Sequence, residues 1–339
     1  MGNTTFDLDR RSFLKGLGVL GAGSVAAAGL AGCAPSGGKA SSASSASGEA
    51  ASDAKGSDKW LNYSFMKREA VGEPEETVQA DFVIVGGGGS GMAALLQAND
   101  LGLNAILLEK KSQCGGTFAF AAVGFYPNNH YAIEAGKKVD YNDLIKTIMT
   151  YNHYIPSYRL LKNYMNEIPE TFDWLENMGC EFAALIPGEG QPGPFSLGTC
   201  CHYVGGDNEG GTGGGKALIA RMIEEAESRG LDMRVNTEAK ELVQDESGKV
   251  TGVLATDKSG KVIKFEAPAV LISTGGWANN EDMLRELGGL NPERVISPGY
   301  DGRDGDGVYM AHKAGAAWAR GNGTVMFYGP HLPGPTWGE

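Results

Sequence analysis

The sequence is short of basic residues and of cysteines, and both shortages exclude classes of protein. It has 29 lysines and arginines against 41 aspartates and glutamates, a formal net charge of −12 over 339 residues. Nucleic-acid binding needs a basic surface that displaces counterions, so we expect no nucleic-acid partner. Five cysteines are too few for a disulfide framework in a chain of this length, and no Cys-x-x-Cys-His motif encodes a covalent haem. No metal site is predicted.

Long apolar runs are also missing. The uncharged run at 16–30 is only mildly apolar and is shorter than the roughly 20 residues of a membrane-spanning helix. It follows Arg10-Arg11-Ser-Phe-Leu-Lys, which resembles a twin-arginine export signal, so residues 1–32 are predicted to be a signal peptide. Leu-Ala-Gly-Cys33 resembles a bacterial lipobox; the alternative is a chance cysteine after an ordinary cleavage site.

With lipidation at Cys33, the protein would pass through the twin-arginine machinery and become a lipoprotein on the outer face of the bacterial cytoplasmic membrane. Residues 33–58 are rich in serine, alanine and glycine and have almost no large apolar side chain. Such a segment cannot bury enough surface to fold, so we expect a flexible tether.

Glycine is abundant, with 52 residues, and part of the excess is clustered at 86–91. The cluster follows an apolar run at 81–85 that is typical of a buried strand, and it precedes a helix-compatible segment at 92–101. A second buried strand at 104–108 ends at Glu109. The cluster matches G-x-G-x-x-G, and its predicted nucleotide-binding residues are Gly86, Gly88, Gly89, Ser90 and Gly91.

Each part of this motif has a physical task. Gly86 turns the chain, Gly88 lets a pyrophosphate approach the backbone, and Gly91 lets the helix pack on the strand. The helix N-terminus favours the anion. Glu109 lies 18 residues after Gly91 (109 minus 91), near the spacing of a carboxylate that binds ribose hydroxyls.

The next segment distinguishes FAD from NAD. Glu109-Lys110 followed by Gly115-Gly116-Thr117 resembles the fumarate reductase and succinate dehydrogenase flavoprotein family, in which this turn lies along FAD. The resemblance implies cofactor contacts from Lys110, Gly115, Gly116 and Thr117. Cys114 is either a site of covalent flavin attachment or a small apolar residue in the core; we expect the second, and therefore noncovalent FAD.

Two later motifs extend the resemblance to residue 320 or so. A buried strand at 269–273 leads into Thr274-Gly275-Gly276, which resembles the family's turn beside the adenosine of FAD. Gly305-Asp306-Gly307 then opens a helical run to residue 317, with Asp304 where the family has threonine. Asp306 has two interpretations, a helix N-cap or a direct cofactor contact.

These motifs predict an α/β fold: a Rossmann-like FAD-binding domain with a parallel sheet, crossover helices and a β-ribbon appendage formed by the hairpin of 250–256 and 261–266. Its bounds are 80–330, divided into a nucleotide-binding half (80–125), a helical insertion (125–205) and a second half (206–330). In the insertion, one helical stripe is expected in the core: Leu161, Tyr164, Met165, Ile168, Phe172 and Leu175.

The sequence leaves the roles of several further residues undecided. His202 is expected to be structural, and Cys200-Cys201 is either a vicinal disulfide or, as we expect, two free thiols. Residues 331–339 are interpreted as the start of a clamp domain that the chain otherwise lacks. His331, the one catalytic candidate, would correspond to a family histidine that holds a substrate carboxylate, and the main acid is expected beyond Glu339.

The resemblance implies an oxidoreductase that reduces an activated C=C bond of a small unsaturated carboxylate. Hydride would come from reduced FAD, and electrons from a membrane-bound donor, either a cytochrome or a quinol-linked protein. Two alternatives remain: a ketosteroid-type FAD dehydrogenase, and a truncated FAD-binding protein without catalysis. In either catalytic case the 339 residues alone are expected to be poorly active.

Overall fold

A computed structural model describes residues 62–121, 123–186, 200–204, 214–294 and 302–317. At its centre is a parallel sheet in the order β11-β2-β3-β7. The strands are β2 (Phe82–Val85), β3 (Ala105–Leu108), β7 (Asp232–Arg234) and β11 (Val270–Ile272). All residues of β2 and β3 are buried, as their unbroken apolar runs predicted. The predicted α/β class is therefore confirmed.

The two faces of this sheet belong to different cores, because side chains alternate along a strand. Phe82 and Ile84 pack on one side with α2 (Gly89–Asp100) and α6 (Gly214–Ser228). Val83 and Val85 pack on the other side with a second sheet and with Tyr309 and Met310 of α8 (Asp306–Lys313). The sheet is thus covered on both faces, as parallel sheets are.

The second sheet has the order β1-β10-β9-β8, with β1 (Glu76–Gln79), β8 (Glu238–Gln244), β9 (Val250–Thr256) and β10 (Val262–Glu266). The predicted hairpin of β9 and β10 is confirmed. Its turn is closed by the Asp257 carboxylate, which accepts hydrogen bonds from the backbone N–H groups of Ser259 (2.8 Å) and Lys261 (3.1 Å). The ribbon is larger than predicted, since β8 joins β9 and β1 pairs parallel with β10.

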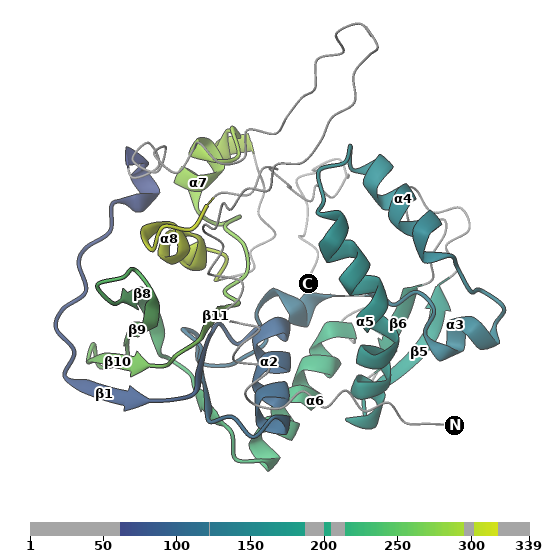
Figure 1. Cartoon of the computed structure of the whole chain (residues 1–339), viewed down its shortest axis with the longest axis horizontal. Coiled ribbons are helices and arrows are strands. Elements are labelled where there is room, and N and C mark those ends of the chain that lie inside the picture. The colour runs from purple at the N-terminus through teal and green to yellow at the C-terminus, as the bar shows by residue number, and fades with distance from the viewer. Residues whose placement is uncertain (1–61, 122, 187–199, 205–213, 295–301, 318–339) are drawn as a thin grey trace, which may run out of the picture.

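The insertion contains a third sheet, β4-β6-β5, built from β4 (Val123–Phe125), β5 (Glu181–Ile186) and β6 (Cys200–Val204). Its helices are α3 (His130–Glu134), α4 (Tyr141–Tyr151) and α5 (Tyr158–Asn177). Figure 1 shows these helices on one side of the molecule and the β-ribbon sheet on the other. Short elements complete the chain: η3 (Ser64–Met66), η4 (Gly116–Phe120), α7 (Glu281–Glu286) and η7 (Pro292–Arg294).

The helical stripe predicted in the insertion is largely confirmed. Four of its members are buried on α5: Met165, Ile168, Phe172 and Leu175. Tyr164 is the exception, since its ring is exposed while its hydroxyl donates to the Phe125 carbonyl at 2.6 Å. Within the described ranges, no helix combines the length and the apolar character that crossing a bilayer requires.

Candidate functional site

The predicted motifs meet at the carboxyl ends of β2, β3 and β11. The glycine-rich turn leaves β2 at Gly86, whose φ of +103° is one that side-chain-bearing residues rarely adopt. Gly91 packs the start of α2 on this turn so closely that a Cβ there would lie 1.9 Å from the Gly86 carbonyl oxygen. The backbone thus agrees with the predicted roles: Gly86 turns the chain, and Gly91 lets the helix pack closely on the strand.

Gly88 is different, because it borders open space. Its φ of −74° and ψ of −175° are extended backbone that any residue adopts, and a Cβ would meet nothing within 4 Å. Added Cβ atoms at Gly275 and Gly276 would also meet nothing within 4 Å. Gly88 is the N-cap of α2 and offers no side-chain hydrogen bond to the first turn, which includes Gly89 and Ser90. The helix N-terminus can therefore receive an anion.

The Gly115-Gly116-Thr117 turn lies beside this glycine-rich turn. The Gly115 N–H donates to the Gly87 carbonyl at 2.8 Å, and Gly88 and Gly115 form a parallel bridge. Gly116 and Thr117 are exposed, so their polar groups face outward from the protein interior. The two segments form one continuous backbone surface.

Cys114 lies under this surface, and the expectation that it packs as an apolar residue is confirmed. It is buried in the core between β2, α2 and α6. A Cβ at Gly87 would lie 2.6 Å from its sulfur. Burial, together with the nearby negative charge of Glu109, raises the pKa of the Cys114 thiol to about 12. Burial similarly raises the pKa of Cys180 to about 11.

Glu109 is held by the motif itself. Its carboxylate is 9% exposed, and its two oxygens accept hydrogen bonds of 2.8 Å from the backbone N–H groups of Gly87 and Lys111. Each carboxylate oxygen has a second lone pair. Glu109 therefore orients the glycine-rich turn and keeps the capacity to accept a ribose hydroxyl, the role predicted for it.

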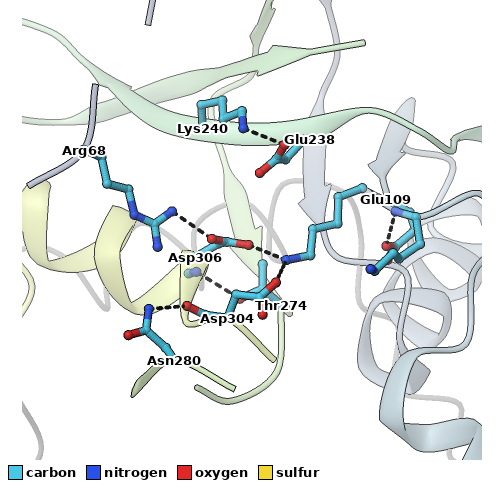
Figure 2. A network of polar contacts seen from close by, with 11 residues as sticks. Arg68, Glu109, Glu238, Lys240, Thr274, Asn280, Asp304 and Asp306 are labelled. Atoms are coloured by element: carbon cyan, nitrogen blue, oxygen red, sulfur yellow. Dashed lines mark hydrogen bonds and ion pairs between the residues drawn. The ribbon is translucent and has the colours of Figure 1, made fainter. Parts of the chain in front are cut away.

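Lys110 belongs to a network of ion pairs that joins distant segments (Figure 2). Its Nζ lies 2.6 Å from Asp304 and 2.7 Å from Asp306, and Asp306 also binds Arg68 at 2.8 Å. The Arg68 guanidinium stacks on the ring of Tyr309, 4.3 Å from its centroid. This half-buried cluster fixes the start of α8 against the end of β3.

The ion pairs of this network shift the pKa values of Asp306 and Lys110 in opposite directions. Burial disfavours the charged form of Asp306, but the ion pairs with Lys110 and Arg68 outweigh it, and the pKa of Asp306 is lowered. Burial likewise opposes the charge of Lys110, whose pKa is nevertheless raised by its hydrogen bonds to Asp304 and Asp306. Both residues are therefore charged over the whole physiological range.

The N-cap interpretation of Asp306 is wrong. Asp306 is the first residue of α8, its N-cap is Gly305 with a φ of +78°, and no side chain of the N-cap residue closes the helix. Instead, the hydroxyl of Thr274 accepts a hydrogen bond from the Gly307 N–H at 3.1 Å. A residue from the end of β11 thus performs the capping, and the Asp306 carboxylate is used for the ion pairs.

Sequence reasoning missed two residues that shape the site. Ser273 donates from Oγ to the carbonyls of Val85 and Gly86, each at 2.9 Å, and so joins β11 to the glycine-rich turn. A serine directly after a strand was a usable signal. The prediction of a buried strand at 269–273 is wrong in its burial, because β11 is only partly buried. Arg68 lies outside every motif, and nothing in its sequence neighbourhood indicates its contact with Asp306.

Several predicted residues lie outside the described residues, namely Cys33 and His331, together with the export signal. For Cys200, Cys201 and His202 only the backbone in β6 is described. Within the described ranges, three possible metal ligands lie together in the insertion, His130, Asp173 and Glu176. His130 Nδ1 is 3.4 Å from Glu176 and 3.8 Å from Asp173, an arrangement that ion pairing explains when His130 is protonated.

The residues present fit FAD. The open space beside Gly88, Gly275 and Gly276 is a cradle for a pyrophosphate and its neighbouring groups, since each Cβ is missing where a ligand would lie. The α2 N-terminus has first-turn N–H groups that would bind an anion, and Glu109 would supply an acceptor for a ribose.

Comparison with known proteins agrees with this geometry. The chain is 31% identical over 273 residues to the urocanate reductase of Eggerthella lenta, covering 79% of this chain and 44% of that protein. It is 30% identical over 245 residues to a fumarate reductase (cytochrome) of Shewanella frigidimarina, covering 72% and 41%. It therefore spans less than half the length of either relative.

The fold also matches a solved structure, the 3-ketosteroid-Δ4-(5α)-dehydrogenase of Rhodococcus jostii RHA1 in complex with 4-androstene-3,17-dione. The TM-score is 0.60 at 25% identity, over 73% of this chain and 55% of that one. Residues 81–336, well over half of the chain, match the family model described as an FAD binding domain. The chain therefore belongs to the FAD-binding domain family, and its cofactor is FAD.

Proposed function

We propose that this chain is the FAD-binding part of a reductase that acts on the activated C=C bond of a small unsaturated carboxylate. The observation that carries the proposal is the FAD cradle at 86–91, 115–117 and 274–276, on a chain similar to reductases of fumarate and urocanate. Both of those compounds are unsaturated carboxylates. Bound FAD would supply the hydride-transfer chemistry.

The described residues of this chain hold the cofactor rather than the substrate. The α2 N-terminus and the backbone at Gly88 would bind the pyrophosphate, and Glu109 would bind the ribose. The ion pairs of Lys110 and Asp306 keep the second half of the domain against this site. The substrate carboxylate would be held by His331, with cationic or N–H donors stabilising the developing charge.

Electrons would come from a membrane-bound donor, either a cytochrome or a quinol-linked protein. The protein would be exported by the twin-arginine machinery and anchored through Cys33, a proposal supported by Arg10-Arg11 and by Leu-Ala-Gly-Cys33. Replacing both arginines with lysines would retain the protein in the cytoplasm, because the recognition would depend on guanidinium geometry as well as on charge. Fractionation of cells that express each protein tests this.

The activity is tested under anaerobic conditions. FAD-loaded protein is reduced chemically and mixed separately with fumarate, urocanate and a 3-ketosteroid, and flavin reoxidation is followed by absorbance. The proposal expects reoxidation by an unsaturated acid in a protein of the full length of the two reductases that the chain matches. Reoxidation of that protein by none of the acids would refute it.

A ketosteroid dehydrogenase is the second candidate, favoured by the structural match to the Rhodococcus enzyme. A second anaerobic assay, which starts from oxidised FAD, separates the two. Oxidised FAD would be bleached by a saturated 3-ketosteroid in a dehydrogenase, whereas a carboxylate reductase would leave its spectrum unchanged with the steroid and respond to the acids.

A further inference from the structure

A cluster of exposed apolar side chains surrounds the connection between α4 and α5. Its members are each more than half exposed, and we name them the tyrosine patch: Tyr151, Tyr154, Ile155, Tyr158 and Leu160. All residues from 151 to 155 are exposed, so the connection between the two helices forms an exposed tip. The tip lies where the chain passes between the two helices labelled in Figure 1, in the insertion and apart from the parallel sheet.

The residues around this tip carry a net positive charge, whereas the whole chain carries a net negative charge. Residues 144–166 include no aspartate or glutamate, although the chain as a whole has a net charge of −12. The same stretch has three exposed cations, Lys146, Arg159 and Lys162. Within the part of the chain that the structure describes, none of the three forms an ion pair, whereas Lys110, Lys261 and many other cations do.

We propose that the tyrosine patch and these three cations bind the surface of an anionic lipid bilayer. Tyrosine is amphipathic and is enriched at the level of the lipid headgroups. Ile155 and Leu160 would enter the acyl boundary, and the three cations would lie among anionic headgroups. Tyrosine and arginine are also enriched in the cores of protein–protein interfaces, but lysine is depleted there. Lys146 and Lys162 therefore favour a bilayer over a protein partner.

This inference does not rest on the proposed reductase activity or on lipidation. To remove any acyl chain, every protein in the test carries Cys33→Ser in the full chain. Binding is measured by co-sedimentation with vesicles of phosphatidylcholine alone and of phosphatidylcholine mixed with phosphatidylglycerol, at low and at physiological salt. Any contribution of residues 1–58 is the same in each variant, so differences report on the patch.

Two pairs of variants test the two parts of the patch. Ile155→Ser is compared with Ile133→Ser, which removes a similarly exposed isoleucine from α3. Lys162→Gln is compared with Lys258→Gln, which removes an exposed lysine from the β9–β10 turn. Bound FAD, measured by absorbance, shows that each variant is folded.

We expect binding to the phosphatidylglycerol vesicles that weakens with salt, and that falls by about fivefold for Lys162→Gln. Ile155→Ser should also weaken binding, and both control variants should bind as the parent does. Equal binding to both kinds of vesicle would overturn the proposal, as would patch variants that bind like their controls. A dimer in solution that Ile155→Ser dissociates would assign the tip to a second copy and would also overturn it.

Discussion

Adding one methyl group at Gly88 and at Gly91 should have opposite consequences, although the two glycines lie in one turn. At Gly88 the backbone is extended and a Cβ meets nothing within 4 Å. At Gly91 the Cβ would lie 1.9 Å from the Gly86 carbonyl oxygen and 2.9 Å from the Ser273 hydroxyl. The alanine variants therefore distinguish a glycine that leaves room for the cofactor, Gly88, from one that allows two backbone segments to pack closely, Gly91.

Gly91→Ala should lower the stability of the fold. The Gly86 carbonyl belongs to the backbone and cannot rotate away, so β2 and α2 must move apart. Overpacking of this kind costs about 1–3 kcal/mol or more, which corresponds to a fall in melting temperature of roughly 2–12 °C for a domain of this size. The same variant should retain less FAD at any temperature, because the turn itself is displaced.

For Gly88→Ala the cost falls on FAD affinity. A methyl group would take the space beside the α2 N-terminus and displace a phosphate from the N–H groups there. Hydrogen bonds to a charged group contribute about 1.5–3 kcal/mol each, so losing two raises the FAD dissociation constant by about 150- to 20,000-fold. The melting temperature of the FAD-free protein should change little, since the extended backbone at Gly88 suits alanine and its Cβ would meet nothing within 4 Å. Gly88→Val should abolish binding.

Melting is followed by circular dichroism on FAD-free protein, and affinity by the quenching of flavin fluorescence on titration. The expected pattern is a normal melting temperature with lost affinity for Gly88→Ala, and a lowered melting temperature for Gly91→Ala. The reasoning is refuted when Gly88→Ala binds FAD as tightly as wild type, or when Gly91→Ala melts at the wild-type temperature.

Three further predictions follow from the same site. Glu109→Ala should weaken FAD binding by about 1–3 kcal/mol, because a charged acceptor is lost and the Gly87 N–H is freed; unchanged affinity in the fluorescence titration would remove Glu109 from the site. Asp306→Asn should lower the free energy of unfolding by about 1–2 kcal/mol at neutral pH. Because its ion pairs lower the pKa of Asp306, this stabilisation is complete above about pH 4 and is lost as pH falls through the lowered pKa. The free energies of unfolding of the two proteins, measured in urea, should therefore become equal in acid. A difference that stays constant with pH would contradict the ion pairing. Cys114, whose pKa burial raises to about 12, should resist iodoacetamide at mildly alkaline pH until denaturant is added, as mass spectrometry would show; prompt labelling of the native protein would contradict its burial.

The parts of the fold that were predictable are those with a local cause. The apolar runs of β2 and β3 could only be buried strands, and each stands beside a motif whose glycines have steric tasks. The stripe on α5 was predictable from its period, except at Tyr164, where the phenol hydrogen-bonds to Phe125 and the ring stays exposed. The hairpin of β9 and β10 has its own turn residues.

The parts that were not predictable depend on distant partners. Strand β1 has a polar sequence and a mostly exposed pattern, and it is a strand because β10 offers a free edge. Asp306 has the residue type of an N-cap, but Lys110 and Arg68 bind its carboxylate while Thr274 caps the helix. Asp306 and Arg68 are 238 positions apart in sequence. No local sequence pattern therefore shows that the Asp306 carboxylate forms ion pairs instead of capping the helix.

The last prediction concerns the start of the domain, which the motifs place at residue 80. The structure indicates that the preceding segment is part of the same unit. Phe65 is buried against Met283 and Leu287, Arg68 binds Asp306, and β1 pairs with β10. Burial of one phenylalanine contributes about 1.5–3 kcal/mol, and the ion pair about 1 kcal/mol more.

A chain that begins at residue 80 should therefore lose about 2.5–4 kcal/mol, a large share of the roughly 5–15 kcal/mol that stabilises a typical domain. The matched control begins at residue 62 and keeps the whole segment. Both are unfolded in urea without FAD, and the free energies of unfolding are compared. Equal stability would mean that the contacts of Phe65 and Arg68 are incidental, and that the site is held by its motifs alone. The expected loss would instead show that the second half of the FAD site depends on residues that precede the first motif.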